Sequence, residues 1–585
     1  MNNPGEFWET LQNVNRIYQL TQRLFGALSR RDLRNPLVEG PGFHYYVRAI
    51  MSSASGMVAN PFTAINAHLQ AITASTAYAS EVYQMILTGE LSRMMKPGAH
   101  ETDEAWARHP FYLGLKHWHK FVSSTIDNAI VVAETPDEKT RQQLGFFANQ
   151  IKAMLAPENY LLTNPAAVRK MIETNGQSVV NGLEHLVEDV ERADGDFLVA
   201  LADPTGFTVG KDLAKTSGYV VYETPLFQLI HYEPRSPNVY ATPIVMIPPW
   251  VNKFYIMDLQ EKNSMIKWIL EQGFSVYMVS WRNPDGKMRD MSLDDYILNG
   301  VVAAVEKVRK LTDQQSVNLL GYCIGGFAAV AASAWYTKQA NKSPIRSLTL
   351  FTTFTDFSEP GSLKVFADPS FTAGLMHEMY RTGVFDKRIL ARTFSFLRPN
   401  DLVYEPAIHS YLLGEERPKF DLLFWNGDST NLPAKMASEL LIRLLRDNEF
   451  TKGKFTVNNV PISIGDIKTP IYAVTGETDH IVPWKSSFKG LAKANGNNRY
   501  VVSRSGHIAG IINHPSRNKY GYWVSDEKPT DCDAWLRNAE LNEGSWWPDW
   551  ARWLTRRSGK KIDIDQGWPD NHPKLEPAPG SYVKA

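Results

Sequence analysis

The clearest indication of the fold of this chain is the sequence Ser316-Val-Asn-Leu-Leu-Gly-Tyr-Cys-Ile-Gly-Gly-Phe-Ala-Ala-Val330. Its apolar first part predicts a buried strand, and its small apolar residues from 326 onward predict a helix. Between them, Gly321-Tyr-Cys-Ile-Gly325 matches the Gly-x-nucleophile-x-Gly pattern, with cysteine as the nucleophile. Glycine flanks such a nucleophile because larger side chains clash across a sharp, strained strand-to-helix turn. The pattern predicts a reactive thiol at Cys323; a buried structural cysteine in a Gly-rich turn is the alternative.

Backbone N–H groups next to Cys323 are expected to bind an oxyanion. The predicted helix points its N-terminus at the thiol, and its dipole favours the thiolate. One donor is expected to be the N–H of Ile324, and the second is expected in the loop after a predicted strand at 243–247. In that loop Trp250 and Val251 are the candidates, of which only one donates, and we favour Val251.

Short β-branched segments and helical segments alternate from about residue 206 onward. The expected strands are 217–223, 227–232, 243–247, 274–280, 317–321, 347–354, 471–476 and 498–503, and the expected helices are 263–272, 294–310 and 326–337. This alternation is typical of a largely parallel sheet with helices on both faces. Together with the turn at Cys323, it predicts an α/β-hydrolase-type catalytic domain over 206–585.

A long insertion is expected between the strands at 347–354 and 471–476. A complete strand–helix–strand unit takes only about 30 residues, so the segment at about 357–467 exceeds one helical crossover. It is rich in aromatic and turn residues. We expect it to form a cap over the carboxyl edge of the sheet; an extra helical subdomain without a gating role is the alternative.

Residues 1–205 predict a mainly helical N-terminal domain. Near the start, apolar residues recur at helical spacing: Phe7, Leu11, Val14, Tyr18, Phe25 and Leu28. Asn164 and Pro165 are typical of an N-cap and a first helical turn, and they precede a predicted helix over 166–190. These patterns fit both a domain that packs on its neighbour and a module that docks a partner.

The overall composition excludes several classes of protein. The 585 residues are 43% hydrophobic and 11% aromatic, which suits a large buried core and not a disordered or fibrous chain. Basic and acidic residues, 62 of each, create no global field that attracts nucleic acid. Two cysteines exclude a disulfide scaffold and a multi-cysteine metal cluster, and they suit a reducing cytosol.

The sequence motifs predict neither a cofactor nor a metal. Walker A, dinucleotide-binding and His-Glu-x-x-His patterns are absent from the sequence. The segment His377-Glu-Met-Tyr-Arg381 does not match the last of these patterns, because it lacks the second histidine. The first residues lack the order of a signal peptide. The uncharged stretch 314–336 is interrupted by glycines near its centre, so it predicts no transmembrane helix. We expect a soluble cytoplasmic protein.

Two loops after predicted strands supply the acid and the base that a thiol nucleophile needs. Asp479 follows the strand at 471–476, and His507 follows the strand at 498–503. Such sheets carry their active sites at the carboxyl ends of the strands, and α/β-hydrolases have the order nucleophile, acid, histidine. We therefore expect Cys323, Asp479 and His507 to form a catalytic triad.

Other residues compete for these roles. His480 adjoins Asp479, so the two side chains tend to diverge, and His514 is expected to be structural. Asp356 follows an earlier strand and is a rival for the acid. Cys532 lacks glycine neighbours, and its two flanking aspartates should raise the pKa of its thiol, which predicts an inert cysteine.

Several motifs occur in a fixed order along the chain. They are Pro248-Pro-Trp-Val-Asn-Lys-Phe-Tyr-Ile-Met-Asp258, Ser280-Trp-Arg-Asn-Pro284, Gly321-Tyr-Cys-Ile-Gly-Gly326, Leu397-Arg-Pro-Asn-Asp401, Phe424-Trp-Asn-Gly-Asp-Ser-Thr-Asn431, Asp479-His-Ile-Val-Pro-Trp484 and Gly506-His-Ile-Ala509. With them the chain resembles the one-component, short-chain (class I) poly(3-hydroxyalkanoate) synthases. The resemblance covers nearly the whole length and is densest from about Phe207 onward. Trp250 stands where members of this family vary, so no family role is assigned to it.

The resemblance implies a function as well as a site. It implies the Cys323–His507–Asp479 triad, a covalent thioester intermediate and (R)-3-hydroxyacyl-CoA substrates such as 3-hydroxybutyryl-CoA. It also implies a growing polyester chain, a homodimer and residence on polymer granules in the cytoplasm. CoA is part of the substrate and a product, so the resemblance implies no cofactor.

Four residues are candidates for the substrate pocket. Trp425, in an aromatic segment of the expected cap, would help to exclude water from the acyl-enzyme, with simple core packing as the alternative. Lys253, Arg282 and Arg398 are candidates for binding the phosphates of CoA, with ordinary salt bridges as the alternative.

Two other functions fit the same residues. A cysteine-triad acyl-CoA thioesterase or hydrolase would use the same site with water as the acceptor. A non-catalytic granule-binding protein would keep the fold with an unreactive cysteine. An intact triad disfavours this second function.

Overall fold

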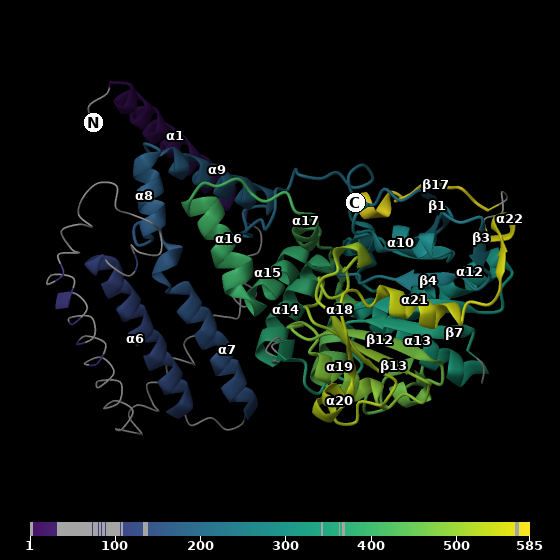
Figure 1. The fold of residues 1–585 in the computed structure, drawn as a ribbon. Helices are drawn as coiled ribbons and strands as arrows, with labels where there is room; N and C mark the ends of the chain where they lie inside the picture. Colours follow the sequence, from purple (N-terminus) through teal and green to yellow (C-terminus); the bar gives the residue numbers. More distant parts are fainter. Residues whose placement is uncertain are drawn as a thin grey trace. The chain divides into compact units, whose positions relative to one another are not determined.

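Two compact units make up the part of the chain that the structure describes (Figure 1). The computed structural model describes residues 4–31, 110–132, 138–340, 343–361, 369–567 and 572–585, and single positions at 73, 76, 80, 83, 84, 88, 106, 109, 363 and 364. The first unit takes the described residues up to Asp203 together with Ala391–Pro418. The second unit takes those of Pro204–Leu390 and Lys419–Ala585.

An 11-stranded sheet forms the centre of the second unit, in the order β15-β14-β13-β12-β7-β6-β4-β5-β2-β1-β17. Its strands are β1 (Gly218–Glu223), β2 (Phe227–Tyr232), β4 (Ile244–Ile247), β5 (Val276–Trp281), β6 (Val317–Tyr322), β7 (Ile345–Phe351), β12 (Ile471–Gly476), β13 (Arg499–Ser503), β14 (Tyr522–Ser525), β15 (Glu540–Asn542) and β17 (Glu576–Pro577). From β13 to β5 neighbouring strands run parallel, whereas the strands at both edges pair antiparallel. Strands β4, β5, β6 and β12 are buried along their whole length, as expected for parallel strands covered on both faces. The predicted α/β sheet is confirmed.

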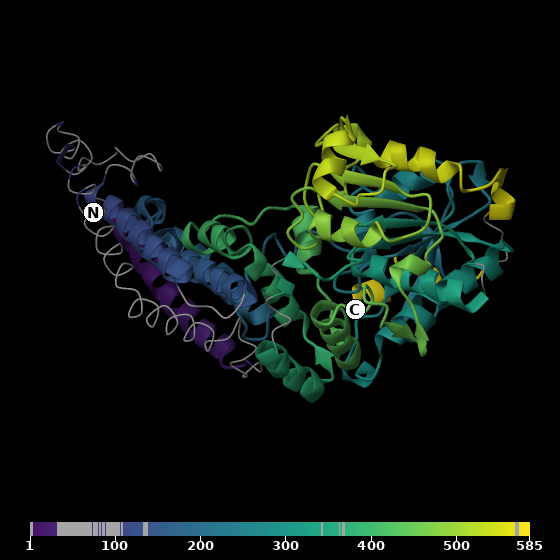
Figure 2. The same cartoon turned by 90° about the horizontal axis from the view of Figure 1, so that it is seen from below.

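Helices lie on both faces of this sheet (Figures 1 and 2). They include α10 (Met265–Glu271), α12 (Ala303–Thr312), α13 (Ile324–Ala340), α19 (Trp484–Leu491), α20 (Cys532–Asn538) and α21 (Trp547–Thr555). On one face, α10 and α21 share a hydrophobic core with Tyr322 and Tyr472 of the sheet. Trp546, Trp547 and Trp550 at α21 are fully buried in that core. With its faces covered, the sheet leaves the strand ends and their loops to carry a site.

The described part of the first unit is helical. Its helices include α1 (Pro4–Leu28), α6 (Pro110–Val132), α7 (Glu138–Met154), α8 (Pro165–Glu173), α9 (Gln177–Arg192) and α16 (Glu405–Ala407). The predicted N-cap is confirmed, because Asn164 Oδ1 accepts hydrogen bonds from two backbone N–H groups in the first turn of α8. The predicted single helix over 166–190 is wrong. Asn175 and Gly176 adopt φ values of 49° and 87°, and this left-handed backbone, which asparagine and glycine tolerate, separates α8 from α9.

Helix α1 packs on α9 with a face other than its predicted apolar stripe. Leu20 of α1 and Val187 of α9 are buried in a small core, and an Arg23–Glu191 ion pair of 2.6 Å borders it. The stripe residues are 39–68% exposed: Phe7, Leu11, Val14, Tyr18, Phe25 and Leu28. The spacing of the stripe therefore predicted the helix correctly but did not identify the face that meets α9.

The long segment between β7 and β12 is divided between the two units. Its described elements include α14 (Pro369–Thr382), β8 (Val384–Phe385), α15 (Lys387–Leu397), α17 (Asp421–Gly427), β9 (Leu432–Pro433), α18 (Ala434–Glu439), β10 (Thr456–Val457) and β11 (Val460–Pro461). Because Ala391–Pro418 belongs to the first unit, the expected insertion at 357–467 is not one continuous subdomain. Its excess length is visible in the sequence, whereas the division depends on long-range packing. A role as a cap stays a prediction.

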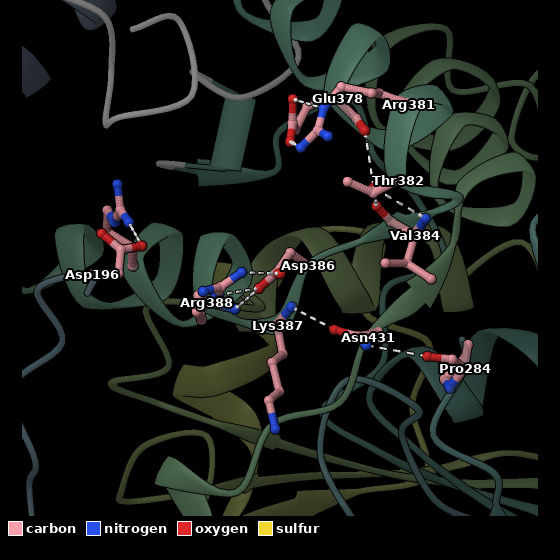
Figure 3. Close-up of polar contacts among 11 residues, drawn as sticks. Asp196, Pro284, Glu378, Arg381, Thr382, Val384, Asp386, Lys387, Arg388 and Asn431 are labelled. Carbon is pink, nitrogen blue, oxygen red and sulfur yellow. Dashed lines mark hydrogen bonds and ion pairs between the residues drawn. The ribbon is translucent and has the colours of Figure 1, made fainter. Parts of the chain in front are cut away.

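Within the second unit, polar contacts join this insertion to the loop after β5 (Figure 3). The Asp386 carboxylate pairs with the Arg388 guanidinium at 2.8 Å, which braces the start of α15. The backbone N–H of Lys387 donates to Asn431 Oδ1 at 2.9 Å, and Asn431 Nδ2 donates to the Pro284 carbonyl at 3.1 Å. Asn431 thus ties two stretches of the insertion to the carboxyl end of β5.

The described residues contain no candidate for a membrane-spanning helix or a metal site. None of their helices is both long and apolar enough to cross a membrane. The same residues contain no group of three or more side chains arranged to hold a metal ion. His377, at the start of the incomplete His-Glu motif, is exposed on α14.

We expect Leu20→Ala to destabilise the α1–α9 pair, because Leu20 is 1% exposed and its loss leaves a cavity. Such a substitution costs about 2–5 kcal/mol. Phe25→Ala on the stripe, where the side chain is 68% exposed, should change the free energy of unfolding by less than about 0.5 kcal/mol. Urea unfolding followed by far-ultraviolet circular dichroism measures both, and equal losses would contradict the packing described for α1.

Candidate active site

Cys323 lies on the turn between β6 and α13, where the sequence pattern predicted it. Its φ of 54° is in the left-handed region, which side chains other than glycine rarely adopt and which stores strain. Its backbone N–H donates to the Phe351 carbonyl of the neighbouring strand β7 at 2.9 Å. The turn therefore presents the thiol at the carboxyl edge of the sheet.

The three glycines of this turn are required by close approach of other atoms. A Cβ atom at Gly321 would lie 2.4 Å from the Cα of Gly326, and one at Gly326 would lie 1.9 Å from Thr353 Oγ1. A Cβ atom at Gly325 would lie 2.4 Å from the Pro248 carbonyl oxygen. The last contact brings the Cys323 turn against the loop after β4, which is the loop expected to carry an oxyanion donor.

His507 and Asp479 form a buried hydrogen-bonded pair. His507 Nδ1 lies 2.7 Å from Asp479 Oδ2, and the two residues are 8% and 7% exposed. The other carboxylate oxygen, Oδ1, accepts the N–H groups of Ile481 and Val482, each at 2.8 Å. These bonds fix the carboxylate, which in turn fixes the imidazole and leaves Nε2 for another partner.

The charges around His507 favour its protonated form. Burial by itself lowers the pKa of His507, but the charges of Asp479 and Cys323 and hydrogen bonds to both outweigh burial and raise the pKa to about 10. An interaction of this kind requires the thiol of Cys323 to lie beside the imidazole. The structure therefore brings together the three residues of the predicted triad.

Three buried aromatic side chains hold the loop that carries His507. The Tyr322 hydroxyl donates to the carbonyl of His507 at 3.2 Å, and the two rings stack with centroids 5.8 Å apart. The indole N–H groups of Trp546 and Trp547 donate to the carbonyls of Gly510 and Ile511 at 2.8 and 2.9 Å. These residues were not among the predicted site residues; the tryptophan cluster at 546–553 was the available signal.

The two expected oxyanion donors lie on adjoining segments. Ile324 begins α13, and Val251 lies in the loop after β4, which contacts the Cys323 turn. Neither N–H donates a hydrogen bond to the described residues.

The other candidate for the second donor, Trp250, is 2% exposed, and its ring packs against Trp281 and Tyr296 with centroids 5.8 and 4.9 Å apart. Its side chain therefore belongs to the core.

The predicted pocket residues make contacts within the protein. Trp425 is 4% exposed and donates its indole N–H to the carbonyl of Lys253 at 2.6 Å. Lys253 Nζ pairs with Asp428 Oδ1 at 3.1 Å, so the alternative of a salt bridge applies to it. Trp425 and Lys253 thus join the insertion to the loop after β4.

The two predicted arginines also have acidic neighbours. Arg282 lies 3.8 Å from Asp285 and stacks over the Tyr582 ring at 5.9 Å. Arg398 pairs with Asp401 at 2.6 Å and belongs to the first unit, whereas Cys323 belongs to the second. A role for Arg398 in binding CoA stays a prediction.

The rival candidates are engaged elsewhere. Asp356 accepts a hydrogen bond from Asn448 at 2.9 Å and lies 3.4 Å from Lys493 Nζ. His514 contacts Ser516 within its own turn at 2.7 Å. Burial raises the pKa of the Cys532 thiol; Lys485 opposes this rise, and the charges of neighbouring aspartates add to it. The Asp479 carboxylate contacts the ring of His507, the residue expected as the base.

Known proteins are similar to this chain over most of its length. Residues 100–269 match the family described as the N-terminus of poly-beta-hydroxybutyrate polymerase (PhaC), and residues 242–513 match the alpha/beta hydrolase fold family. The poly(3-hydroxyalkanoate) polymerase subunit PhaC of Rhizobium etli is 37% identical over 82% of this chain and 76% of its own length. The corresponding subunit of Cupriavidus necator is 40% identical over 77% of each chain, and that of Rhizobium meliloti is 35% identical over 82% and 79%. The predicted α/β-hydrolase-type fold is confirmed.

We expect Asp479→Asn to lower the pKa of His507, because the aspartate charge is the strongest influence that raises it. In the wild type the protonated imidazole stabilises the fold fully below pH 6.5, its ordinary pKa, and this contribution disappears as the pH rises through about 10. In the variant it should disappear at a lower pH. Carbon-13 NMR of protein labelled at the histidine ring measures the pKa, and His507→Gln assigns the resonance. A pKa that stays at about 10 in Asp479→Asn would contradict the proposed electrostatics.

Proposed function

The chain belongs to the poly(3-hydroxyalkanoate) polymerase family and is an enzyme of the acyltransferase type, and on this premise we propose its substrate and mechanism. It polymerises short (R)-3-hydroxyacyl groups, such as 3-hydroxybutyryl, from their CoA thioesters and releases CoA. The reaction runs through a Cys323–His507–Asp479 triad with a covalent thioester on Cys323. The observation that carries the proposal is the 2.7 Å contact of His507 with Asp479 beside the strained turn of Cys323.

Acylation replaces one thioester by another. The proton of the Cys323 thiol passes to His507, which gives the imidazolium that Asp479 stabilises, and the sulfur attacks the thioester carbonyl of the acyl-CoA. The resulting oxyanion accepts hydrogen bonds from the N–H groups of Ile324 and Val251. When the tetrahedral intermediate collapses, the carbon–sulfur bond to CoA breaks and the CoA sulfur receives the proton from His507. The bond formed and the bond broken are of one kind, so the transfer is nearly isoenergetic.

Elongation uses the same base on a hydroxyl group. His507 takes the proton of a 3-hydroxyl, whose oxygen attacks the acyl thioester on Cys323, and the thiol is regenerated as the ester forms. Asp479 holds the tautomer of His507 in this step or assists at the hydroxyl. When the attacking hydroxyl belongs to an acyl-CoA, the lengthened chain leaves as a non-covalent CoA thioester and then acylates Cys323 again, releasing CoA.

One reactive thiol per chain is sufficient for this scheme. Cys532 is half-buried, and its pKa is raised, so it is a poor second acyl carrier. A thiol from a partner subunit is the alternative to the non-covalent intermediate.

Family membership supports a homodimer bound to polymer granules in the cytoplasm. Burial of His507 and Asp479 supports a site that keeps water from the acyl-enzyme. The proposed chemistry balances without a metal or a redox cofactor.

We expect Asp479→Asn to keep detectable acylation of Cys323 but to lower polymer formation by about 10²–10⁴-fold, the usual contribution of general base catalysis. With 3-hydroxybutyryl-CoA as substrate, a thiol reagent measures CoA release and turbidity measures polymer. Cys532→Ala is the matched control and should keep wild-type activity.

Each remaining outcome identifies a different error. Unchanged polymer yield in Asp479→Asn would contradict the role of the aspartate, and an inactive Cys532→Ala would contradict the single-thiol scheme. Free 3-hydroxybutyrate without turbidity would identify a thioesterase. Absence of CoA release from the wild type would point to a non-catalytic granule protein.

A further inference from the structure

We propose that Thr430, which follows α17 in the insertion, is a positioning residue for the oxyanion site. By holding the peptide bond between Trp250 and Val251, it would direct the Val251 N–H toward the carbonyl oxygen that becomes negatively charged. The inference rests on the proposed function, because it assumes acyl transfer at Cys323 with Val251 as a donor.

Thr430 contacts the backbone on both sides of the Val251 N–H. Its hydroxyl donates to the carbonyl of Trp250 at 2.6 Å, and its own N–H donates to the carbonyl of Val251 at 3.1 Å. A trans peptide is planar, and its C=O and N–H point in opposite directions. Since the Trp250 carbonyl points to Thr430, the Val251 N–H of the same peptide points away from Thr430. Rotation of this peptide would break the 2.6 Å bond.

Neighbouring contacts hold the rest of this loop in the same manner. The Pro248 carbonyl accepts the indole N–H of Trp281 at 3.0 Å, and the Lys253 carbonyl accepts that of Trp425 at 2.6 Å. With carbonyls held on either side, the Val251 N–H still donates to none of the described residues. Such an arrangement suits a backbone donor reserved for a ligand.

Thr430 is itself held rigidly. It is 5% exposed, and the residue before it, Ser429, forms an isolated antiparallel bridge with Asn252. The residue after it, Asn431, accepts a hydrogen bond from Lys387 and donates one to the Pro284 carbonyl (Figure 3). Locked neighbours of this kind are what a preorganised donor needs, because a loosely held N–H stabilises an oxyanion poorly.

A purely structural role for Thr430 is the competing explanation, since the same bonds join the insertion to the loop after β4. The two explanations differ in which reactions of Cys323 they affect. Attack on a thioester passes through an oxyanion, whereas alkylation by iodoacetamide is a displacement at a saturated carbon and forms none. Loss of orientation at Val251 slows only the first reaction, but general loosening of the site slows both.

The test compares Thr430→Val, which removes the hydroxyl at nearly constant volume, with Thr430→Ser, which keeps it. We expect Thr430→Val to lower kcat for CoA release from 3-hydroxybutyryl-CoA by about 10- to 100-fold, with KM little changed. This is less than the roughly 10²–10³-fold cost of losing a whole oxyanion donor, because the N–H remains but is no longer held. Thr430→Ser should recover to within about threefold of wild type, and the rate of iodoacetamide alkylation at Cys323 should be equal in all three proteins.

Several results would overturn the proposal. They are a normal kcat in Thr430→Val, failure of Thr430→Ser to recover, and an equal loss of CoA release and alkylation. If Thr430→Val does not fold, Thr430→Ala takes its place, since it adds no bulk. Cys323→Ala in the same assays distinguishes failure of the proposed function from failure of the positioning role. CoA release by that variant would refute the proposed function itself. An inactive Cys323→Ala together with a normal Thr430→Val would refute only the positioning role of Thr430.

Discussion

The buried contact between His507 and Asp479 is the interaction on which the rest of the candidate site depends. An imidazolium is unfavourable in a buried place, and the carboxylate 2.7 Å away makes it favourable. The contact exists because β12 and β13 are parallel neighbours, with Gly476 opposite Ser503, so that the loops after them start at the same edge of the sheet. Strand β6 ends at the same edge, so that Cys323 lies beside the imidazole of His507, whose orientation Asp479 fixes.

The loops at this edge have little regular structure, and side chains from distant elements hold their backbone. Tyr322 and Trp546 donate to carbonyls of the His507 loop, and Trp425 and Thr430 donate to carbonyls of the loop after β4. One hydrogen bond contributes only about 0.5–1.5 kcal/mol to stability. Several such bonds together restrict the backbone of a loop to one conformation. The geometry proposed for acyl transfer therefore depends on contacts made by residues other than Cys323, His507 and Asp479.

The placement of Cys323, Asp479 and His507 at one edge of the sheet could be predicted from the sequence because each of the three signals is local. The glycines around Cys323 indicate a sharp turn in which only small neighbouring residues fit. Asp479 and His507 follow segments that are typical of parallel strands. Thr430 had no such signal, because the carbonyl it holds lies 180 residues away. The sequence shows the positive charge of Lys253 but not that Asp428 is its partner. It therefore could not distinguish a lysine that binds phosphate from one that forms a salt bridge. The division of the insertion between two units was hidden for the same reason.

The most direct test of the account is to locate the acyl group on the protein. Enzyme mixed with 3-hydroxybutyryl-CoA is quenched in acid within the first turnover, digested and analysed by mass spectrometry. We expect the mass of a 3-hydroxybutyryl group on the peptide that contains Cys323 and none on the peptide that contains Cys532, and we expect His507→Gln to slow its appearance. An acyl group on Cys532, or polymer formation without any acylated cysteine, would contradict it.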